Sequence, residues 1–201
     1  MSINVCNDRS MASITSFPSG VSGSSLVLIS EQTASSSSAI SFTSGIDSTY
    51  KQYIFKFINI HGSGTSSNNF TFQTSTNGGS SYGVTLTSAF FYTYHGESAG
   101  DNGLTYNTSA DLAQSTNFQR LCTTNGANND SSASGTLQLF NPSSTTFVKN
   151  FISDATEELS NYVQNSFVSG YFNTTSAINA VQFKMSSSNI DSGTIKMYGV
   201  V

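Results

Sequence analysis

The sequence predicts an all-β protein whose body is an antiparallel β-sandwich of jelly-roll-like type, preceded by an extended N-terminal arm. Short runs of alternating apolar and polar residues are separated by stretches of Ser, Thr, Asn and Gly, and charged residues are scarce. In the run NFTFQ at 69–73, Phe70 and Phe72 fall on one face, as a half-buried strand requires. About nine to eleven such runs, with polar turns between them and no convincing helical pattern, are typical of a sandwich.

Length and aromatic content indicate one folded domain over residues 25–201. A chain of 201 residues suits a single sandwich or barrel. The apolar share is only 36%, but 15 Phe and 9 Tyr concentrate burial in large side chains. The chain can therefore bury a sizeable core.

Charge is low and scattered. Only 9% of residues are charged, the net charge is −4, and the 7 Lys and Arg residues stand singly. Because nucleic acids and anionic membranes attract basic clusters, we expect neither as a partner. The chain start lacks the charged head and apolar run of a signal peptide, and no stretch approaches the roughly 20 apolar residues of a membrane span. We therefore expect the protein to fold in a cytoplasm.

Residues 1–24 are predicted to form an arm, because this segment is polar and rich in Gly and Ser. Alone it buries too little surface to offset its ordering entropy. Either a neighbouring subunit or the chain's own domain is expected to hold it. The candidate assembly contacts are its apolar residues Ile3, Val5, Met11, Ile14 and Phe17.

The body is expected to begin with a core strand at 25–31, a continuous apolar run, followed by an alternating strand at 40–43. Residues 50–60 predict a long central strand with both faces at least partly covered. Its two faces hold the aromatic residues Tyr53, Phe55 and Phe57 and the aliphatic residues Ile54, Ile58 and Ile60. The strand at 70–74 is its expected neighbour.

The strongest turn signal is Asn77-Gly78-Gly79, since Asn and Gly tolerate positive φ. A hairpin is expected to lead from it to a strand at 82–87, and another strand follows at 90–94. The polar segment 95–129 contains scattered large apolar residues, so it is predicted to be a packed insertion with some strand character.

The second half repeats the same pattern. A strand at 137–140 is expected to end at Asn141-Pro142, because proline lacks a donor and has a fixed φ. The acidic cluster at 154–159 is interpreted as an exposed turn or a single helical turn. The remaining predicted strands lie at 147–152, 162–168, 181–185 and 194–198.

No pattern of catalytic residues stands out, so we expect no enzyme. His61 lies in a Gly/Ser context and His95 precedes Gly96, and neither has a nucleophile-elbow motif nearby. The acids Asp154, Glu157 and Glu158 are three in five residues, which is more typical of a solvated turn than of a glycosidase pair.

No cofactor or metal is expected, because zinc needs about four clustered ligands and only two cysteines and two histidines are present. Two free thiols at Cys6 and Cys122 are favoured over a bridge between them.

The aromatic run at 90–94 places Phe90, Tyr92 and Tyr94 on one face of a strand and Phe91 on the other. Tyr92 and Tyr94 are the candidate ligand or subunit contacts. Core packing or subunit contact is favoured over a glycan platform, because the chain has no Trp.

A family resemblance rests on segments that span most of residues 23–201. They are GSSLVLISEQT at 23–33, IDSTYKQYIFKFINIH at 46–61, FTFQ at 70–73, GGSSY at 78–82, FNPSS at 140–144, GYFN at 170–173 and SGTIKMYG at 192–199. Together they resemble small β-rich structural proteins of tailed bacteriophages of marine bacteria, of the cyanophage or pelagiphage type. The resemblance implies a virion component with no catalytic residue.

The predicted function is that of a bacteriophage virion structural protein, with a capsid decoration or cement protein as the first choice. The alternative is a tail-associated or fibre module that binds host-surface glycan, and a third reading is a secreted sugar-binding module. Expected partners are the major capsid protein or tail proteins of the same virion. By analogy with viral jelly rolls we expect a homo-oligomer, preferably a trimer, assembled in the cytoplasm of the bacterial host.

Overall fold

The computed structural model describes residues 25–64, 66–98, 100–126 and 128–201, and every regular element in these ranges is a β-strand. The strands are β1 (Leu26–Thr33), β2 (Ile40–Phe42), β3 (Gln52–Gly62), β4 (Ser67–Ser75), β5 (Leu86–Gly96), β6 (Asn102–Tyr106), β7 (Gln119–Asn125), β8 (Ala133–Phe140), β9 (Lys149–Glu158), β10 (Tyr162–Phe172), β11 (Ala180–Met185) and β12 (Ile190–Val200). The predicted all-β class is confirmed, with twelve strands in place of nine to eleven.

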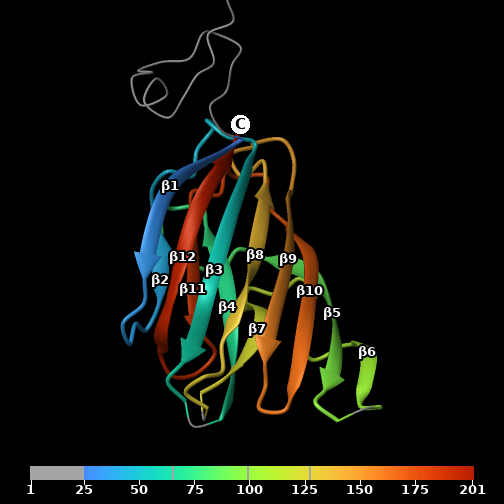
Figure 1. The fold of residues 1–201 in the computed structure, drawn as a ribbon. Coiled ribbons are helices and arrows are strands. Elements are labelled where there is room, and N and C mark those ends of the chain that lie inside the picture. Colours follow the sequence, from blue (N-terminus) through green and yellow to red (C-terminus); the bar gives the residue numbers. More distant parts are fainter. Residues whose placement is uncertain (1–24, 65, 99, 127) are drawn as a thin grey trace, which may run out of the picture.

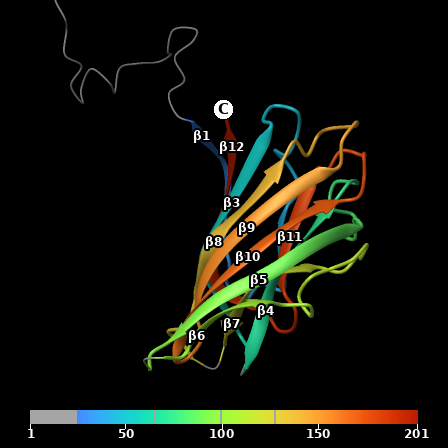
Figure 2. The ribbon, with the colours of Figure 1, turned by 90° about the vertical axis from the view of Figure 1, so that its right-hand side faces the viewer.

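Two antiparallel sheets of unequal size form the body. The large sheet has eight strands in the order β1-β12-β3-β8-β9-β10-β5-β6, and the small sheet has four in the order β2-β11-β4-β7 (Figure 1). The small sheet lies on one side of the large one, as the turned view shows (Figure 2). The predicted sandwich is therefore confirmed. Its jelly-roll character and the N-terminal arm stay predictions, and residues 1–24 lie outside the described ranges.

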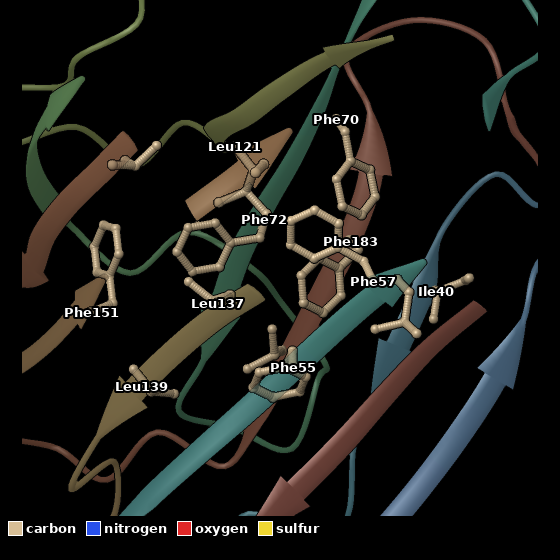
Figure 3. Packing of buried hydrophobic residues seen from close by; sticks show 14 of the residues in the cluster. Ile40, Phe55, Phe57, Phe70, Phe72, Leu121, Leu137, Leu139, Phe151 and Phe183 are labelled. Carbon is tan, nitrogen blue, oxygen red and sulfur yellow. The ribbon is translucent and has the colours of Figure 1, made fainter. Parts of the chain in front are cut away.

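Aromatic side chains fill the space between the sheets (Figure 3). Tyr53, Phe55 and Phe57 of β3 are fully buried, as their alternation predicts. The ring centroids of Phe57 and Phe70 are 5.3 Å apart, and Phe183 stacks on Phe70 at 5.7 Å. Because each of these rings removes a large apolar area from water, this cluster supplies much of the free energy that holds the sheets together.

The structure corrects the expected neighbour of β3. This strand pairs with β12 and β8, whereas the 70–74 strand, β4, lies in the opposite sheet and packs face to face against it. The alternation of apolar and polar residues determines which face of a strand is buried, but it does not determine which strand lies next to it.

The prediction that Ile54, Ile58 and Ile60 share the second face of β3 is also partly wrong. Ile58 is exposed, but Ile60 is fully buried, because the register with β8 shifts between Phe57 and Ile60. Asn59 adopts a positive φ of 52° at this irregularity. A bulge inserts an extra residue and exchanges the faces beyond it, so Ile60 points inward.

The turn at Asn77-Gly78-Gly79 exists, but the hairpin expected from it does not. Gly78 and Gly79 have positive φ values of 70° and 85°, and the next strand begins only at Leu86. That strand, β5, belongs to the large sheet and pairs with β10 and β6. The turn therefore carries the chain from one sheet to the other.

The acidic cluster is part of a strand, contrary to the predicted turn. Residues 154–158 continue β9, in which every second residue from Phe151 to Glu157 is buried. Asp154 and Glu158 point to solvent, while Glu157 points inward. The period of two continues through the acids, and sheet pairing on both sides outweighs the charge pattern.

The polar segment 95–129 is a packed insertion with strand character, as predicted, because it contains β6 and β7. Cys122 of β7 is a buried free thiol, and burial raises its pKa well above the ordinary value. Cys6 lies outside the described residues.

Candidate functional site

The best-formed candidate site lies on the inner face of the large sheet, where the β5–β6 hairpin ends that sheet (Figure 1, lower right). As predicted, Phe90, Tyr92 and Tyr94 share this face; Phe90 is fully buried and the two tyrosines are half-buried. A cleft of about 230 Å³ opens beside them. We call it the tyrosine cleft, and its walls are Tyr92, Tyr94, Asp101, Thr105, Tyr162 and Gln164.

Sheet pairing brings three tyrosines together. In the register of β5 with β10, Tyr94 lies opposite Gln164, and Tyr162 lies opposite Gly96. The ring centroids of Tyr92 and Tyr94 are 6.2 Å apart at 42°, and those of Tyr94 and Tyr162 are 6.3 Å apart at 73°. The rings of Tyr94 and Tyr162 therefore stand nearly perpendicular to each other.

Two glycines make room for the cleft residues. Gly103 lies opposite Tyr94, and a Cβ there would stand 2.8 Å from Tyr94 Cε1. A Cβ at Gly96 would stand 2.7 Å from Asp101 Oδ2. Contacts this short do not occur for real Cβ atoms, so glycine at both positions permits the observed places of the Tyr94 ring and the Asp101 carboxylate.

A buried hydrogen-bond network orients Gln164 at the back of the cleft. Its Nε2 donates to Glu157 Oε1 at 2.6 Å and to Ser166 Oγ at 3.1 Å. Ser166 in turn donates to Glu157 Oε1 at 2.7 Å. The Gln164 side chain is therefore held in one orientation before any ligand arrives.

Glu157 carries the most perturbed carboxyl of the described residues. It is 1% exposed, and its Oε2 finds no hydrogen-bond donor in the described part of the chain. Burial raises the pKa of Glu157 to about 7, against the opposing effects of its hydrogen bonds and of the Arg120 charge. The carboxyl is thus close to half-protonated at neutral pH.

Arg120 of β7 covers the same region from the small sheet. Its guanidinium lies 5.0 Å from the Phe90 ring centroid, a cation–π geometry, and it donates a hydrogen bond to Thr123 Oγ1. Burial lowers the pKa of Arg120, and the nearby Glu157 carboxylate opposes this shift. An arginine stays protonated even so, which leaves a positive charge behind the cleft.

A second candidate surface lies on the outer face of the large sheet, which the small sheet does not cover. We call it the outer apolar patch, and it consists of Phe91, Leu104, Tyr106, Ile152, Val163 and Phe167. Leu104 is 69% exposed and Ile152 is 49% exposed. The Phe91 and Phe167 rings stack at 5.0 Å and 15°, beside a shallow hollow of about 300 Å³.

A larger hollow lies elsewhere, but it offers fewer aromatic and charged groups to a ligand. It measures about 560 Å³ and is lined mainly by hydroxyl and backbone groups of the 76–85 loop, Thr116 and Thr174. It has one aromatic lining residue, Tyr82, and no charged lining residue among those described. We therefore regard the smaller tyrosine cleft as the better binding site.

The two histidines differ in their surroundings. His61 Nδ1 is 3.5 Å from Asp191 Oδ2, and its Nε2 is 3.2 Å from the Asn128 carbonyl oxygen. His95 is exposed on β5, opposite Val163 and Asn102.

Across the described ranges, no group of three or more His, Cys, Asp or Glu side chains is placed to hold a metal ion. None of the elements in these ranges is a helix long and apolar enough to cross a membrane.

Sequence reasoning identified two of the six cleft residues. Tyr92 and Tyr94 line the cleft, whereas Asp101, Thr105, Tyr162 and Gln164 were missed. A usable signal was the polar alternation in β10, where Gln164 and Ser166 take inward positions that an apolar core does not need. The predicted arm contacts Ile3, Val5, Met11, Ile14 and Phe17 lie outside the described residues.

Comparison with known proteins gives no relative: no family model, no curated protein and no solved structure matches the chain.

Proposed function

We propose that this protein is a non-enzymatic structural protein of a bacteriophage virion, and specifically a decoration or cement protein of the capsid. The outer apolar patch is the observation that carries the proposal. Large apolar side chains exposed on the solvent face of a sheet mark interaction surfaces, and paired aromatic rings such as Phe91 and Phe167 are typical anchors of protein interfaces. The exposed Asp154 lies opposite Phe167 in the register and adds a carboxylate to this surface.

The rest of the molecule suits a mechanical role. Its core is dense in aromatic rings, while its surface depends on hydroxyl and amide groups more than on charge. A cement protein acts by mass action, because contacts that bridge shell subunits favour the assembled state when they outweigh the entropy lost on docking. The proposed partner is the major capsid protein, and a trimer of this chain is the proposed oligomer.

A charge placed in the patch tests the proposal. Ile152→Asp replaces the one exposed apolar side chain of β9 by a second carboxylate beside Asp154, so binding to particles that lack this protein should weaken by about tenfold or more. Ser176→Asp is the matched control, because Ser176 is exposed outside the patch. Cosedimentation with the particles measures the binding, and the melting temperatures of both variants should stay near that of the wild type.

Copy number separates the capsid from the tail. Quantitative mass spectrometry of purified virions should find hundreds of copies for a shell protein. A few dozen or fewer would favour the alternative, a tail-associated or fibre module that binds host glycan. Absence from the virion would contradict both.

A further inference from the structure

We propose that the tyrosine cleft binds one ring of a neutral glycan, a hexopyranose. The cleft lies on the inner face of β5 and β6, whereas the outer apolar patch lies on their opposite face, so both surfaces can be occupied at once. The inference goes beyond the docking role of the patch and does not depend on it.

The aromatic geometry matches the shape of a sugar ring. A hexopyranose has an apolar C–H face and a rim of hydroxyl groups. Tyr94 and Tyr162 meet at 73° with centroids 6.3 Å apart, so one ring offers a platform for the C–H face while the other closes an edge. The cleft volume of about 230 Å³ is below the roughly 300–1,000 Å³ of pockets for drug-sized ligands, so it holds one ring and leaves the rest of a glycan in solvent.

The polar groups of the cleft suit a hydroxyl rim. The Asp101 carboxylate accepts hydrogen bonds from hydroxyls, the Thr105 hydroxyl can donate or accept, and the Gln164 amide is already oriented by Glu157 and Ser166. A few fixed polar groups beside aromatic walls are the composition of a small-ligand site. Pre-orientation lowers the entropy lost on binding.

Charge at the cleft selects a neutral sugar. Asp101 is exposed and lines the cleft, so a sugar carboxylate would meet a like charge there. The Arg120 cation is not a lining residue of the cleft and lies over the Phe90 ring. Uronic and sialic acids should therefore bind more weakly than neutral hexoses.

Titration of the full-length protein with simple sugars tests the inference. The probes are the methyl glycosides of glucose, galactose, mannose and N-acetylglucosamine, with methyl glucuronide and free sialic acid as charged comparators. Saturation-transfer NMR and calorimetry should show binding of at least one neutral glycoside with a Kd on the order of millimolar, as expected for a single exposed ring. Each charged comparator should bind at least about tenfold more weakly.

Three variants locate the site. Tyr94→Ala removes the platform and Asp101→Asn removes the carboxylate, and each should weaken binding by about tenfold or more. Tyr106→Ala is the matched control, because Tyr106 is exposed on the outer face of the same hairpin. It should leave sugar binding unchanged. Thermal melts establish that each variant is folded, and Asp101→Asn, a near-isosteric change, keeps the test valid if Tyr94→Ala is unstable.

Four results would overturn the inference. These are no saturable binding of any neutral glycoside by folded protein, binding that survives both cleft substitutions, equal affinity for methyl glucuronide, or equal affinity for free sialic acid. Loss of sugar binding with intact particle binding would leave the proposed capsid role standing, since that role depends on the opposite face.

Discussion

Glu157 and Phe55 represent two ways in which a single buried residue determines the properties of this protein. Glu157 is a carboxyl enclosed by the two sheets with one oxygen unpartnered among the described residues, which makes the charged form costly. Phe55 is a ring enclosed by other rings, with Phe42 at 5.4 Å and Phe183 at 5.5 Å. Glu157 makes the free energy of unfolding depend on pH, whereas Phe55 contributes to that free energy at every pH.

Stability should fall as pH rises from about 4.5 to about 7. Glu157 has a pKa of about 7 in the folded protein against an ordinary 4.5, so in this window the folded state binds more protons than the unfolded state. The free energy of unfolding therefore decreases with rising pH, by roughly 3 kcal/mol at most for a shift of this size. Urea denaturation between pH 4.5 and 8 measures it. Glu157→Gln should remove this part of the slope, and an unchanged slope in the variant would contradict the assignment.

Phe55→Ala should be among the most damaging core substitutions. Removal of a buried Phe typically costs about 3–5 kcal/mol, which corresponds to a fall in melting temperature of roughly 6–20 °C for a domain of this size. Tyr92→Ala should cost less, because Tyr92 is only half-buried at the edge of the core. Thermal melts of both variants provide the comparison. A harmless Phe55→Ala would mean that the wrong face of β3 has been placed inside.

Residue positions were predictable from the sequence where a strict period of two holds. The inward places of Tyr53, Phe55 and Phe57 follow from alternation alone. The inward place of Ile60 does not follow from alternation, because a bulge near Asn59 changes which face of β3 the later residues occupy. The charge of Glu157 predicts a solvated turn, whereas its place in the alternation predicts a buried strand position, and the structure follows the alternation.

At the scale of elements, the sequence does not predict which strands pair with each other. β3 pairs with β12, far along the chain, and no local signal names that partner. The tyrosine cleft depends on such pairings, since Tyr94 of β5 meets Tyr162 of β10 and Gly103 of β6 only after the sheet forms. The strand containing Tyr92 and Tyr94 was predictable, but the composition of the cleft was not.

A single methyl group added at Gly103 should disrupt the proposed sugar site of the β5–β6 hairpin. A Cβ at position 103 would stand 2.8 Å from the Tyr94 ring, so Gly103→Ala should displace that ring and weaken methyl glycoside binding by about tenfold. The melting temperature should change little, because the hairpin lies at the edge of the sheet. Gly83→Ala is the control, since its Cβ would find only an ordinary contact of 3.8 Å. Unchanged sugar binding in Gly103→Ala would contradict the assigned role of Tyr94.

At the scale of the whole molecule, the unequal size of the two sheets leaves surface exposed on both faces of the large sheet, and the two proposed binding surfaces lie on these opposite faces. A four-stranded sheet covers only part of one face of an eight-stranded sheet. The uncovered outer face carries the apolar patch, and the inner face at the β5–β6 end carries the tyrosine cleft. A body of this kind can attach to a particle through one surface while it presents the other to solvent.

The last prediction separates the folding of the body from its attachment. The buried apolar cluster of the described residues extends from Ala34 to Met197, so a variant that lacks residues 1–22 should keep a single cooperative thermal transition. If the N-terminal segment contributes to attachment as the sequence predicts, this variant should bind particles more weakly than the full chain, and adding Ile152→Asp should weaken binding further. If the segment attaches at a surface other than the patch, the two effects on binding free energy should add. Aggregation or a broad melt of the truncated protein would instead assign the segment to the fold, and particle binding unaffected by the deletion would leave attachment to the patch.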